Sequence, residues 1–380
     1  MTRLKPYSVL PLIDCLISFV VAFLFMDTKN NVDLSFVIPC LNEEETIGGV
    51  IDEINNALDG SGIKYEIIVS DNGSTDKSKD ISLSKGCRVV EERIHKGYGA
   101  ALQKGFGAAQ GEYVAFSDAD GSYIVSHIKD MYKTAKEKNC DMVISSRLKG
   151  EIEESAMPFL HRYLGTPVLT FLINIFFNGR LSDCNSRFRL IRKEAYEKWN
   201  IKGMGMEFAS ELLVKALKNK ASIIEIPSGL RRDKRSRSPH LKTWRDGMRH
   251  LLFILSESAH IFEYVAYIFV LLSLFLLSFT PHLTISLLLM IGGFESFFIS
   301  IFLYRTHGNG KLNTLTRILV NLKEDTLFFF LAAMLFMLII TGILIVGFPD
   351  MGAIFAPIAV APLLTGSNLL LIYMSKKADD

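Results

Sequence analysis

The sequence predicts an α/β protein with a mostly parallel sheet, followed by a set of membrane-spanning helices. Three observations support this class. Between residues 33 and 230, short β-rich runs alternate with longer amphipathic stretches, as in strand–helix–strand units. Polar clusters directly follow several of the predicted strands. Beyond residue 260 the chain becomes almost continuously apolar.

The predicted strands and helices alternate along the first part of the chain. We expect strands over residues 34–39, 66–70, 88–91, 113–117, 142–145 and 223–227, and helices over 44–58, 77–85, 99–110, 126–138 and 208–217. Helices that join parallel strands cover both faces of the sheet. Ligands of such sheets bind beyond the carboxyl ends of the strands, where the polar clusters of this chain lie.

Composition and motifs exclude several classes of function. The 380 residues carry 42 Lys and Arg against 40 Asp and Glu. This near balance argues against a chain that binds its partner through a strong overall positive charge, as histones do, or through a strong overall negative charge. The five cysteines form no CxxC pair, which excludes a zinc ribbon and favours reduced cytosolic thiols. The loop at 95–100 fails the dinucleotide fingerprint because Leu102 stands in place of its third glycine, and no P-loop motif occurs.

Four apolar stretches predict a C-terminal membrane region. Residues 261–280 and 283–304 each contain a single charged residue, a glutamate. Residues 327–374 also contain a single charged residue, Asp350, near which the run divides into two spans. Lysines and arginines gather in the link at 305–326 and at the C-terminus. The positive-inside rule therefore predicts a multi-pass integral membrane protein whose large N-terminal domain faces the cytosol.

The chain divides into four predicted parts: a hydrophobic segment at 1–32, a cytosolic catalytic domain at 33–240, a juxtamembrane amphipathic helix at 241–260 and the spans of 261–380. Within the first part, the apolar run 9–26 contains Pro11 and Asp14. A spanning helix, an interfacial helix and a leader ahead of a second start at Met26 all remain open. The basic run 231–237 and the apolar stripe after it predict contact with lipid headgroups.

Two carboxylates end one predicted strand. Asp118 and Asp120 follow the apolar run 113–117 and precede Gly121, where a turn brings both to one site. Such a pair is either a solvated turn or a site for Mg²⁺ or Mn²⁺ bridging a diphosphate. The clusters at 39–45 and 71–76 are ambiguous in the same way, between helix starts and nucleotide contacts.

The order of these motifs resembles that of the family 2 glycosyltransferases. The motifs are P-x-x-N-E from Pro39, D-x-G-S-x-D from Asp71, K-G-x-G-x-A from Lys96, D-A-D-G from Asp118 and D-C-N-S-R-F-R from Asp183, followed by a basic loop and membrane helices. Within that family the chain is similar to the polyprenyl-phosphate glycosyltransferases, the group of dolichol-phosphate mannose and glucose synthases. The resemblance implies a GT-A type fold.

The resemblance also implies roles for matching positions. Those implied for the nucleotide sugar are Pro39, Asn42, Glu43, Asp71, Gly73, Lys96, Gly97, Asp118 and Ala119. Those implied for catalysis are Asp118, Asp120, Arg147 and Asp183, with the metal at the first two. Those implied for the acceptor phosphate are Arg147, Ser186, Arg187, Arg189, Arg231, Arg232 and Arg235. Arg187 stands where the family usually has glycine, so it either alters the loop's backbone or adds a phosphate ligand.

The implied reaction is inverting transfer of a hexose from a nucleotide diphosphate sugar to a polyprenyl or dolichyl phosphate at the bilayer, for glycan or glycolipid assembly. Glucose is favoured because residues 238–247 resemble glucosyl-type relatives, and mannose from GDP-mannose is the alternative. A processive polysaccharide synthase is a weaker interpretation because no Q-x-x-R-W segment occurs. A non-catalytic membrane interaction protein is a further alternative. No nucleic-acid partner is expected, and a homo-oligomer remains open.

Overall fold

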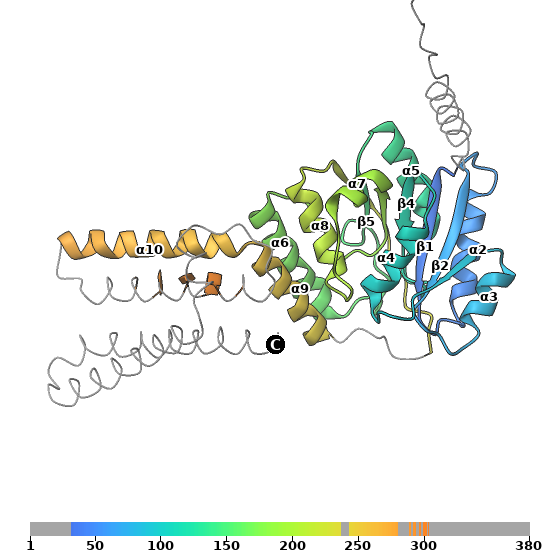
Figure 1. Cartoon of the computed structure of the whole chain (residues 1–380), viewed down its shortest axis with the longest axis horizontal. Coiled ribbons are helices and arrows are strands. Elements are labelled where there is room, and N and C mark those ends of the chain that lie inside the picture. Colours follow the sequence, from blue (N-terminus) through green and yellow to red (C-terminus); the bar gives the residue numbers. More distant parts are fainter. Residues whose placement is uncertain are drawn as a thin grey trace, which may run out of the picture.

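The computed structural model describes residues 32–236 and 243–279, with scattered positions between 289 and 303. Its centre is a seven-stranded sheet in the order β3-β2-β1-β4-β6-β5-β7 (Figure 1). The strands are β1 (Leu34–Cys40), β2 (Tyr65–Asp71), β3 (Arg88–Glu91), β4 (Tyr113–Phe116), β5 (Met142–Ser146), β6 (Arg189–Arg192) and β7 (Ile223–Pro227). β6 pairs antiparallel with β4 and β5, and the other pairs are parallel. The predicted mostly parallel sheet is confirmed, whereas β6 was not predicted.

Helices cover both faces of this sheet, as expected. They are α2 (Ile47–Leu58), α3 (Ser78–Ser84), α4 (Tyr98–Ala108), η1 (Val125–His127), α5 (Ile128–Glu137), η2 (His161–Gly165), α6 (Thr166–Phe177), α7 (Lys193–Trp199), α8 (Phe208–Lys218), α9 (Thr243–Glu257) and α10 (Ala259–Phe279). The apolar residues of α2 recur at helical spacing, so one face of the helix packs on the sheet.

Two hydrophobic cores follow from the alternation of side chains along the strands. In β1, Phe36 and Ile38 point into the core beneath α2 and α5, whereas Val37 points into the core beneath α4, α6 and α8. All three side chains are fully buried. Burial on both faces makes a central strand such as β1 almost continuously apolar, with the polar cluster at its end.

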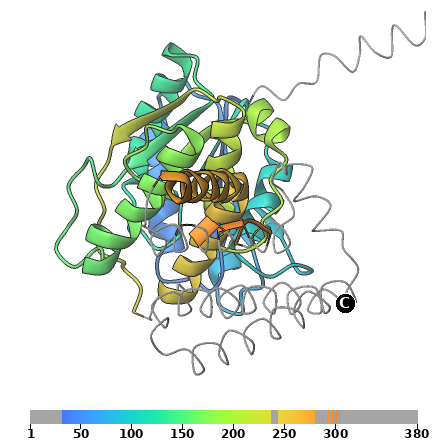
Figure 2. The same ribbon diagram turned by 90° about the vertical axis from the view of Figure 1, so that its left-hand side faces the viewer.

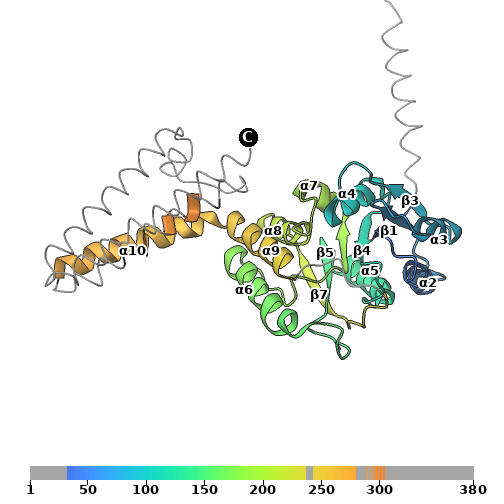
Figure 3. The same cartoon turned by 90° about the horizontal axis from the view of Figure 1, so that it is seen from below.

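The C-terminal helices leave the domain at one end. α9 packs on α6 and α8, and α10 projects away from the domain, as Figures 1 and 3 show and as Figure 2 shows from that end. Among the described residues, no single helix is long and apolar enough to count as a membrane span. One pair, Gly247–Glu257 and Ala259–Phe275, bent by 64°, passes the same criteria together. The predicted segment 9–26 and the predicted spans beyond 304 lie outside the described residues, and the one at 283–304 is described only at scattered positions.

Candidate active site

A cavity of about 800 Å³ lies at the carboxyl ends of the strands, where the sequence placed the polar clusters. Its walls come from the loops after β1, β2, β3, β4, β5 and β7 and from the loops before β6 and α8. Ten of the predicted site residues line it: Pro39, Glu43, Lys96, Gly97, Asp118, Ala119, Asp120, Arg147, Arg187 and Arg235. The strand-end prediction therefore located the cavity.

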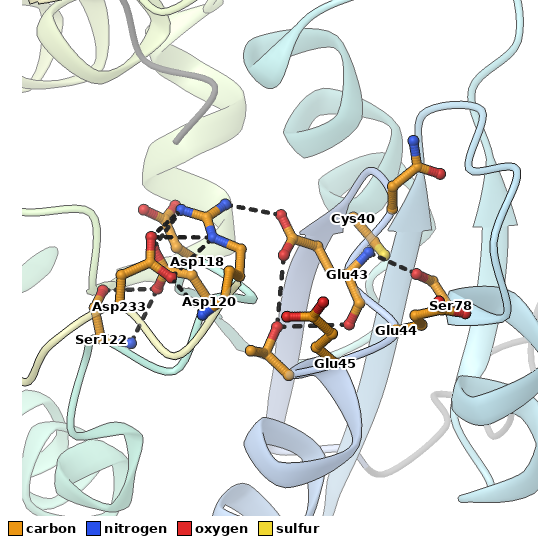
Figure 4. A network of polar contacts seen from close by, with 12 residues as sticks. Cys40, Glu43, Glu44, Glu45, Ser78, Asp118, Asp120, Ser122 and Asp233 are labelled. Atoms are coloured by element: carbon orange, nitrogen blue, oxygen red, sulfur yellow. Dashed lines mark hydrogen bonds and ion pairs between the residues drawn. The ribbon is translucent and has the colours of Figure 1, made fainter. Parts of the chain in front are cut away.

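The paired carboxylates follow β4, and the turn expected at Gly121 is present, with a φ of +70°. The backbone nitrogen and hydroxyl of Ser122 donate to Oδ1 of Asp120 at 3.0 and 2.6 Å. Burial, and then the charge of Asp118, raise the pKa of Asp120. Figure 4 shows Asp118, Asp120 and Asp233 gathered on one side of the site with Glu43 facing them. Because neighbouring carboxylates repel one another, this group needs positive charge close by.

The carboxylate pair fits a divalent cation. Oδ1 of Asp118 is buried and accepts no hydrogen bond from the described residues. The part of the chain that the structure describes holds no cluster of three or more His, Cys, Asp or Glu that forms a complete metal site. Mg²⁺ and Mn²⁺ often bind one or two protein carboxylates and take further ligands from substrate phosphates. Asp118 and Asp120 therefore suit a cation that arrives with a diphosphate.

The loops after β1 and β2 brace each other. Asp71 accepts hydrogen bonds from the backbone nitrogens of Gly73 and Ser74 at 3.2 and 3.1 Å. The side-chain oxygen of Asn42 accepts a hydrogen bond from the backbone nitrogen of Thr75 at 2.7 Å. Asp71, Asn42 and Gly73 do not line the 800 Å³ cavity. Their hydrogen bonds hold the two loops in shape instead.

The K-G-x-G segment forms the next wall, at the start of α4. Gly97 donates its backbone nitrogen to the side-chain oxygen of Asn72 at 2.9 Å and has a φ of +136°. A Cβ at this position would lie 2.4 Å from the backbone oxygen of Met204, so only glycine fits. Lys96 donates to the backbone oxygen of Asn72 at 3.2 Å. This packing holds Lys96 at the cavity.

A buried ion pair forms the wall beyond β5. Nε and Nη2 of Arg147 donate to the two oxygens of Asp183 at 2.7 and 2.8 Å, and the side chains are 12% and 0% exposed. Burial by itself raises the pKa of Asp183, but Arg147 more than offsets this and lowers it. Asp183 is fully enclosed, so it positions Arg147, which lines the cavity.

Arg187 adds a second cation to the same cavity. Its Nη1 donates to Oδ2 of Asp118 at 2.9 Å, and its guanidinium lies 5.4 Å from the centre of the Tyr98 ring. Burial opposes the charge, but Asp118 holds the pKa of Arg187 above its ordinary value. Arg187 does not adopt a left-handed backbone conformation, so the loop accommodates arginine here without that strain.

Four predicted phosphate ligands point elsewhere in this structure. Ser186 donates its hydroxyl to the backbone oxygen of Ser145. Arg189 is fully buried and donates to three backbone carbonyls, and burial lowers its pKa to about 10. Arg231 pairs with Glu53 at 2.8 Å, and the largely exposed Arg232 lies near Glu154. None of the four lines the cavity.

Arg235 lies on the side of the cavity where the nucleotide residues were predicted. Its guanidinium donates to Glu43 at 3.0 Å and to Asp120 at 3.3 Å, and it also pairs with Asp233. The resemblance implied a role for Arg235 at the acceptor phosphate. In this structure residues 233–235 pass beside these carboxylates, and the backbone nitrogen of Lys234 donates to the backbone oxygen of Asp120 at 3.3 Å.

Sequence reasoning missed several residues of the cavity: Tyr98, Tyr123, His161 and Arg249. Tyr98 follows the K-G pair directly, and that position was the one available signal for it. His161 precedes α6 and Arg249 lies in α9, and no motif in the sequence connects either segment with the strand ends.

The fold and cavity define a class of α/β proteins in which a cavity at the carboxyl ends of the strands holds a pair of carboxylates beside arginines. The family model described as "Glycosyl transferase family 2" matches residues 35–199. An uncharacterized protein of Methanocaldococcus jannaschii, MJ1222, is 30% identical over 208 residues, which cover 52% of this chain and 81% of that protein. The chain belongs to glycosyl transferase family 2.

Other relatives are more specific. The low-salt glycan biosynthesis hexosyltransferase Agl6 of Haloferax volcanii is 36% identical, covering 58% of this chain and 53% of Agl6. The dolichol-phosphate mannosyltransferase of Pyrococcus furiosus is 28% identical, and the match covers 51% of this chain and 55% of that protein. The chain thus spans about half the length of these two relatives. A structure of glucosyl-3-phosphoglycerate synthase from Mycobacterium tuberculosis superposes with a TM-score of 0.49 at 22% identity. The match covers 60% of this chain and 81% of that protein.

Proposed function

We propose that this protein is a membrane-bound, metal-dependent inverting hexosyltransferase that uses a nucleotide diphosphate sugar and a polyprenyl phosphate. One observation carries the proposal. A single cavity holds the carboxylates Asp118 and Asp120 together with Arg147 and Arg187. Carboxylates suit a metal-bound diphosphate, and arginines suit a phosphate that is not metal-bound. The cavity therefore has the parts for two different phosphorylated substrates.

The donor lies between β1 and β4 in this proposal. Pro39, Glu43 and Ala119 come from the loops after β1 and β4, and Lys96 and Gly97 come from the loop after β3. All five line the cavity. Asp118 and Asp120 would hold Mg²⁺ or Mn²⁺, and such a cation would supply positive charge to offset that of the departing diphosphate. Lys96 places a further positive charge on this side of the cavity.

The acceptor phosphate lies toward Arg147 and Arg187. A phosphate monoester is already anionic at neutral pH, so its oxygen attacks without a strong general base. The new bond forms between that oxygen and the anomeric carbon as the bond to the nucleotide diphosphate breaks, and single displacement inverts the configuration. Asp183 keeps Arg147 charged and fixed in direction, which helps to orient the attacking phosphate.

The relatives support the proposal by their names, as a hexosyltransferase and a dolichol-phosphate mannosyltransferase. We favour glucose as the sugar, from the resemblance of residues 238–247 to glucosyl-type relatives, and mannose is the second candidate. The apolar helix α10, which leaves the domain at one end, supports attachment to a bilayer. The lysines and arginines of the link at 305–326 support a cytosolic catalytic domain by the positive-inside rule.

A panel experiment tests the proposal. Purified full-length protein is incubated with a short polyprenyl phosphate and, in turn, UDP-glucose, GDP-mannose and other nucleotide sugars, with Mn²⁺ or with a chelator. We expect a lipid-linked phosphosugar from one donor, and none with the chelator or with Asp118→Asn. Sugar transfer only to growing glycan chains would favour a polysaccharide synthase, and no turnover of any donor would favour a non-catalytic protein.

A further inference from the structure

Tyr98, the first residue of α4, carries a hydroxyl group that is buried and has no hydrogen-bond partner among the described residues. The side chain nevertheless lines the cavity. Burying a hydroxyl group without a partner is unfavourable, and few groups of this kind occur in a folded protein. An unpaired hydroxyl at a cavity wall is therefore a group that a bound ligand can pair.

The loop before α8 fixes the turn of α4 that carries Tyr98. The backbone nitrogen of Gly99 donates to the backbone oxygen of Gly205 at 3.2 Å. The backbone nitrogen of Ala100 donates to the backbone oxygen of Met204 at 2.9 Å. A Cβ at Gly99 would overlap the backbone of this loop, so the two segments are in direct contact. Tyr98 is thus presented to the cavity from a fixed point.

Tyr98 also lies between the groups assigned to the two substrates. Burial, and then the charge of Asp118, raise the pKa of Tyr98, so its hydroxyl stands beside that carboxylate. The guanidinium of Arg187 lies 5.4 Å from the centre of the Tyr98 ring, and its Nη1 lies 2.9 Å from Oδ2 of Asp118. The three side chains are therefore neighbours at the cavity wall.

The same three side chains mark the place of the sugar. In the proposed function, Asp118 stands at the donor diphosphate and Arg187 at the acceptor phosphate. The hexose is bonded to the first group and attacked by the second, so it lies between them and next to Tyr98. A tyrosine hydroxyl is neutral at neutral pH, because the ordinary pKa of tyrosine is about 10. It donates one hydrogen bond and accepts others, which matches a sugar hydroxyl.

We infer that Tyr98 binds a hydroxyl group of the transferred hexose and thereby helps to select the donor sugar. The inference rests on the proposed function, because the two phosphates define where the sugar lies. It adds a residue that distinguishes one hexose from another. A site that pairs a substrate hydroxyl rejects an analogue without that group, since its own buried polar group is then left unpaired.

Donor analogues that each lack one hydroxyl group of the hexose test the inference. Full-length protein is given Mn²⁺, a short polyprenyl phosphate and either the nucleotide sugar that the parent uses best or one of its deoxy analogues. The kcat/KM for each donor is measured with the parent and with Tyr98→Phe, which keeps the ring and removes only the hydroxyl. Tyr196→Phe is the matched control, because the Tyr196 ring packs 4.4 Å from that of Phe106 in α4 and does not line the cavity.

We expect Tyr98→Phe to lower kcat/KM for the complete sugar by about tenfold or more, and to change it by less than about twofold for one deoxy analogue. That analogue already lacks the hydroxyl that Tyr98 binds. Tyr196→Phe should change no value. An equal loss for the complete sugar and for every analogue, or no loss at all, would overturn the inference and leave the proposed function standing. Failure of the parent to transfer any sugar would remove the proposed function and the inference with it.

Binding without the acceptor separates a role at the sugar from a role at the metal. UDP or GDP with Mn²⁺ lacks the hexose, so calorimetry should give the same affinity for the parent and for Tyr98→Phe. The corresponding sugar nucleotide should bind Tyr98→Phe severalfold more weakly than it binds the parent. Equal weakening for both ligands would show that Tyr98 acts through Asp118 on the cation, and would overturn the inference.

Discussion

Replacing Asp183 by asparagine tests whether the enclosed carboxylate holds Arg147 in place. Asparagine keeps the size of the side chain and one acceptor oxygen but removes the charge. Arg147, whose side chain is 12% exposed, would then remain charged without its counter-ion. The variant therefore separates the electrostatic role of Asp183 from its packing.

The expected cost follows from the geometry of the pair. Two charge-assisted hydrogen bonds of 2.7 and 2.8 Å join the side chains, and the backbone nitrogen of Arg147 donates a third at 3.0 Å. Removing one partner of such a buried pair costs about 3 to 5 kcal/mol of unfolding free energy. For a domain of this size that corresponds to a fall in Tm of about 6 to 20 °C.

Thermal unfolding of the parent and of Asp183→Asn measures this, with Glu194→Gln as the control. Glu194 pairs with Lys198 through side chains that are 71% and 68% exposed, so its loss should leave the Tm unchanged. The pKa of Asp183 is lowered in the folded protein, so its contribution is present above the ordinary aspartate pKa of about 3.9 and is lost as the pH falls through the folded value. The difference between parent and variant should therefore be constant near neutral pH and shrink below about pH 4.

Equal melting of the parent, Asp183→Asn and Glu194→Gln would refute the reasoning, because it would mean that Arg147 does not depend on Asp183. A difference that persists unchanged at the lowest pH would also refute it, since the charge would then not be the cause. In the transfer assay, the folded fraction of Asp183→Asn should show a raised KM for the lipid phosphate and an unchanged KM for the nucleotide sugar.

The remaining predictions concern the carboxylates, the basic loop and the topology. Asp118→Asn and Asp120→Asn should each abolish sugar transfer, and full activity of either variant at saturating donor would contradict the metal assignment. Asp120→Asn should not lower the Tm, because burial already disfavours the charge of Asp120. Arg235→Gln should strengthen Mn²⁺ binding measured without donor, because the guanidinium competes for Asp120, whereas Arg232→Gln should not; equal affinities would contradict this. A cysteine at Lys311 should react with a thiol reagent from the cytosolic side, and protection there would overturn the predicted topology.

The parallel part of the sheet was predictable because its strands are buried on both faces. The β1 run 34–40 is apolar apart from Ser35 and ends at a polar cluster, which gives both the strand and its functional end. The same pattern located β2 and β4, and with them the cavity at their carboxyl ends. Binding sites at such ends follow from the topology of parallel sheets and need no side-chain detail.

The antiparallel strand β6 and helix α6 were not predictable by the same means. β6 has four residues, two of which are arginines, so it shows no period of two in hydrophobicity. α6 is apolar on its buried face and on its exposed face, which removes the periodicity that identifies a surface helix.

Contacts between distant segments were also beyond the sequence. Arg235 pairs with Glu43, 192 positions earlier in the chain, and no spacing rule connects them. Arg189 looks like an anion ligand in the sequence, but its neighbours in space are the backbone oxygens of Cys184, Ser186 and Ala209. Only the path of the loop, which tertiary packing decides, distinguishes a structural arginine from one that lines a site.

The loop before β6 joins the two sides of the cavity. Its Asp183 holds Arg147, which follows β5, and its Arg187 holds Asp118, which follows β4. The fully buried Arg189 at the end of the loop is bonded to backbone oxygens within it, which keeps the loop from shifting. A displacement of this one loop would therefore move the carboxylate assigned to the donor and the arginine assigned to the acceptor together. Glycine in place of Arg187 would keep the link to Arg147 but release Asp118, so the arginine couples the geometry of the two proposed substrates.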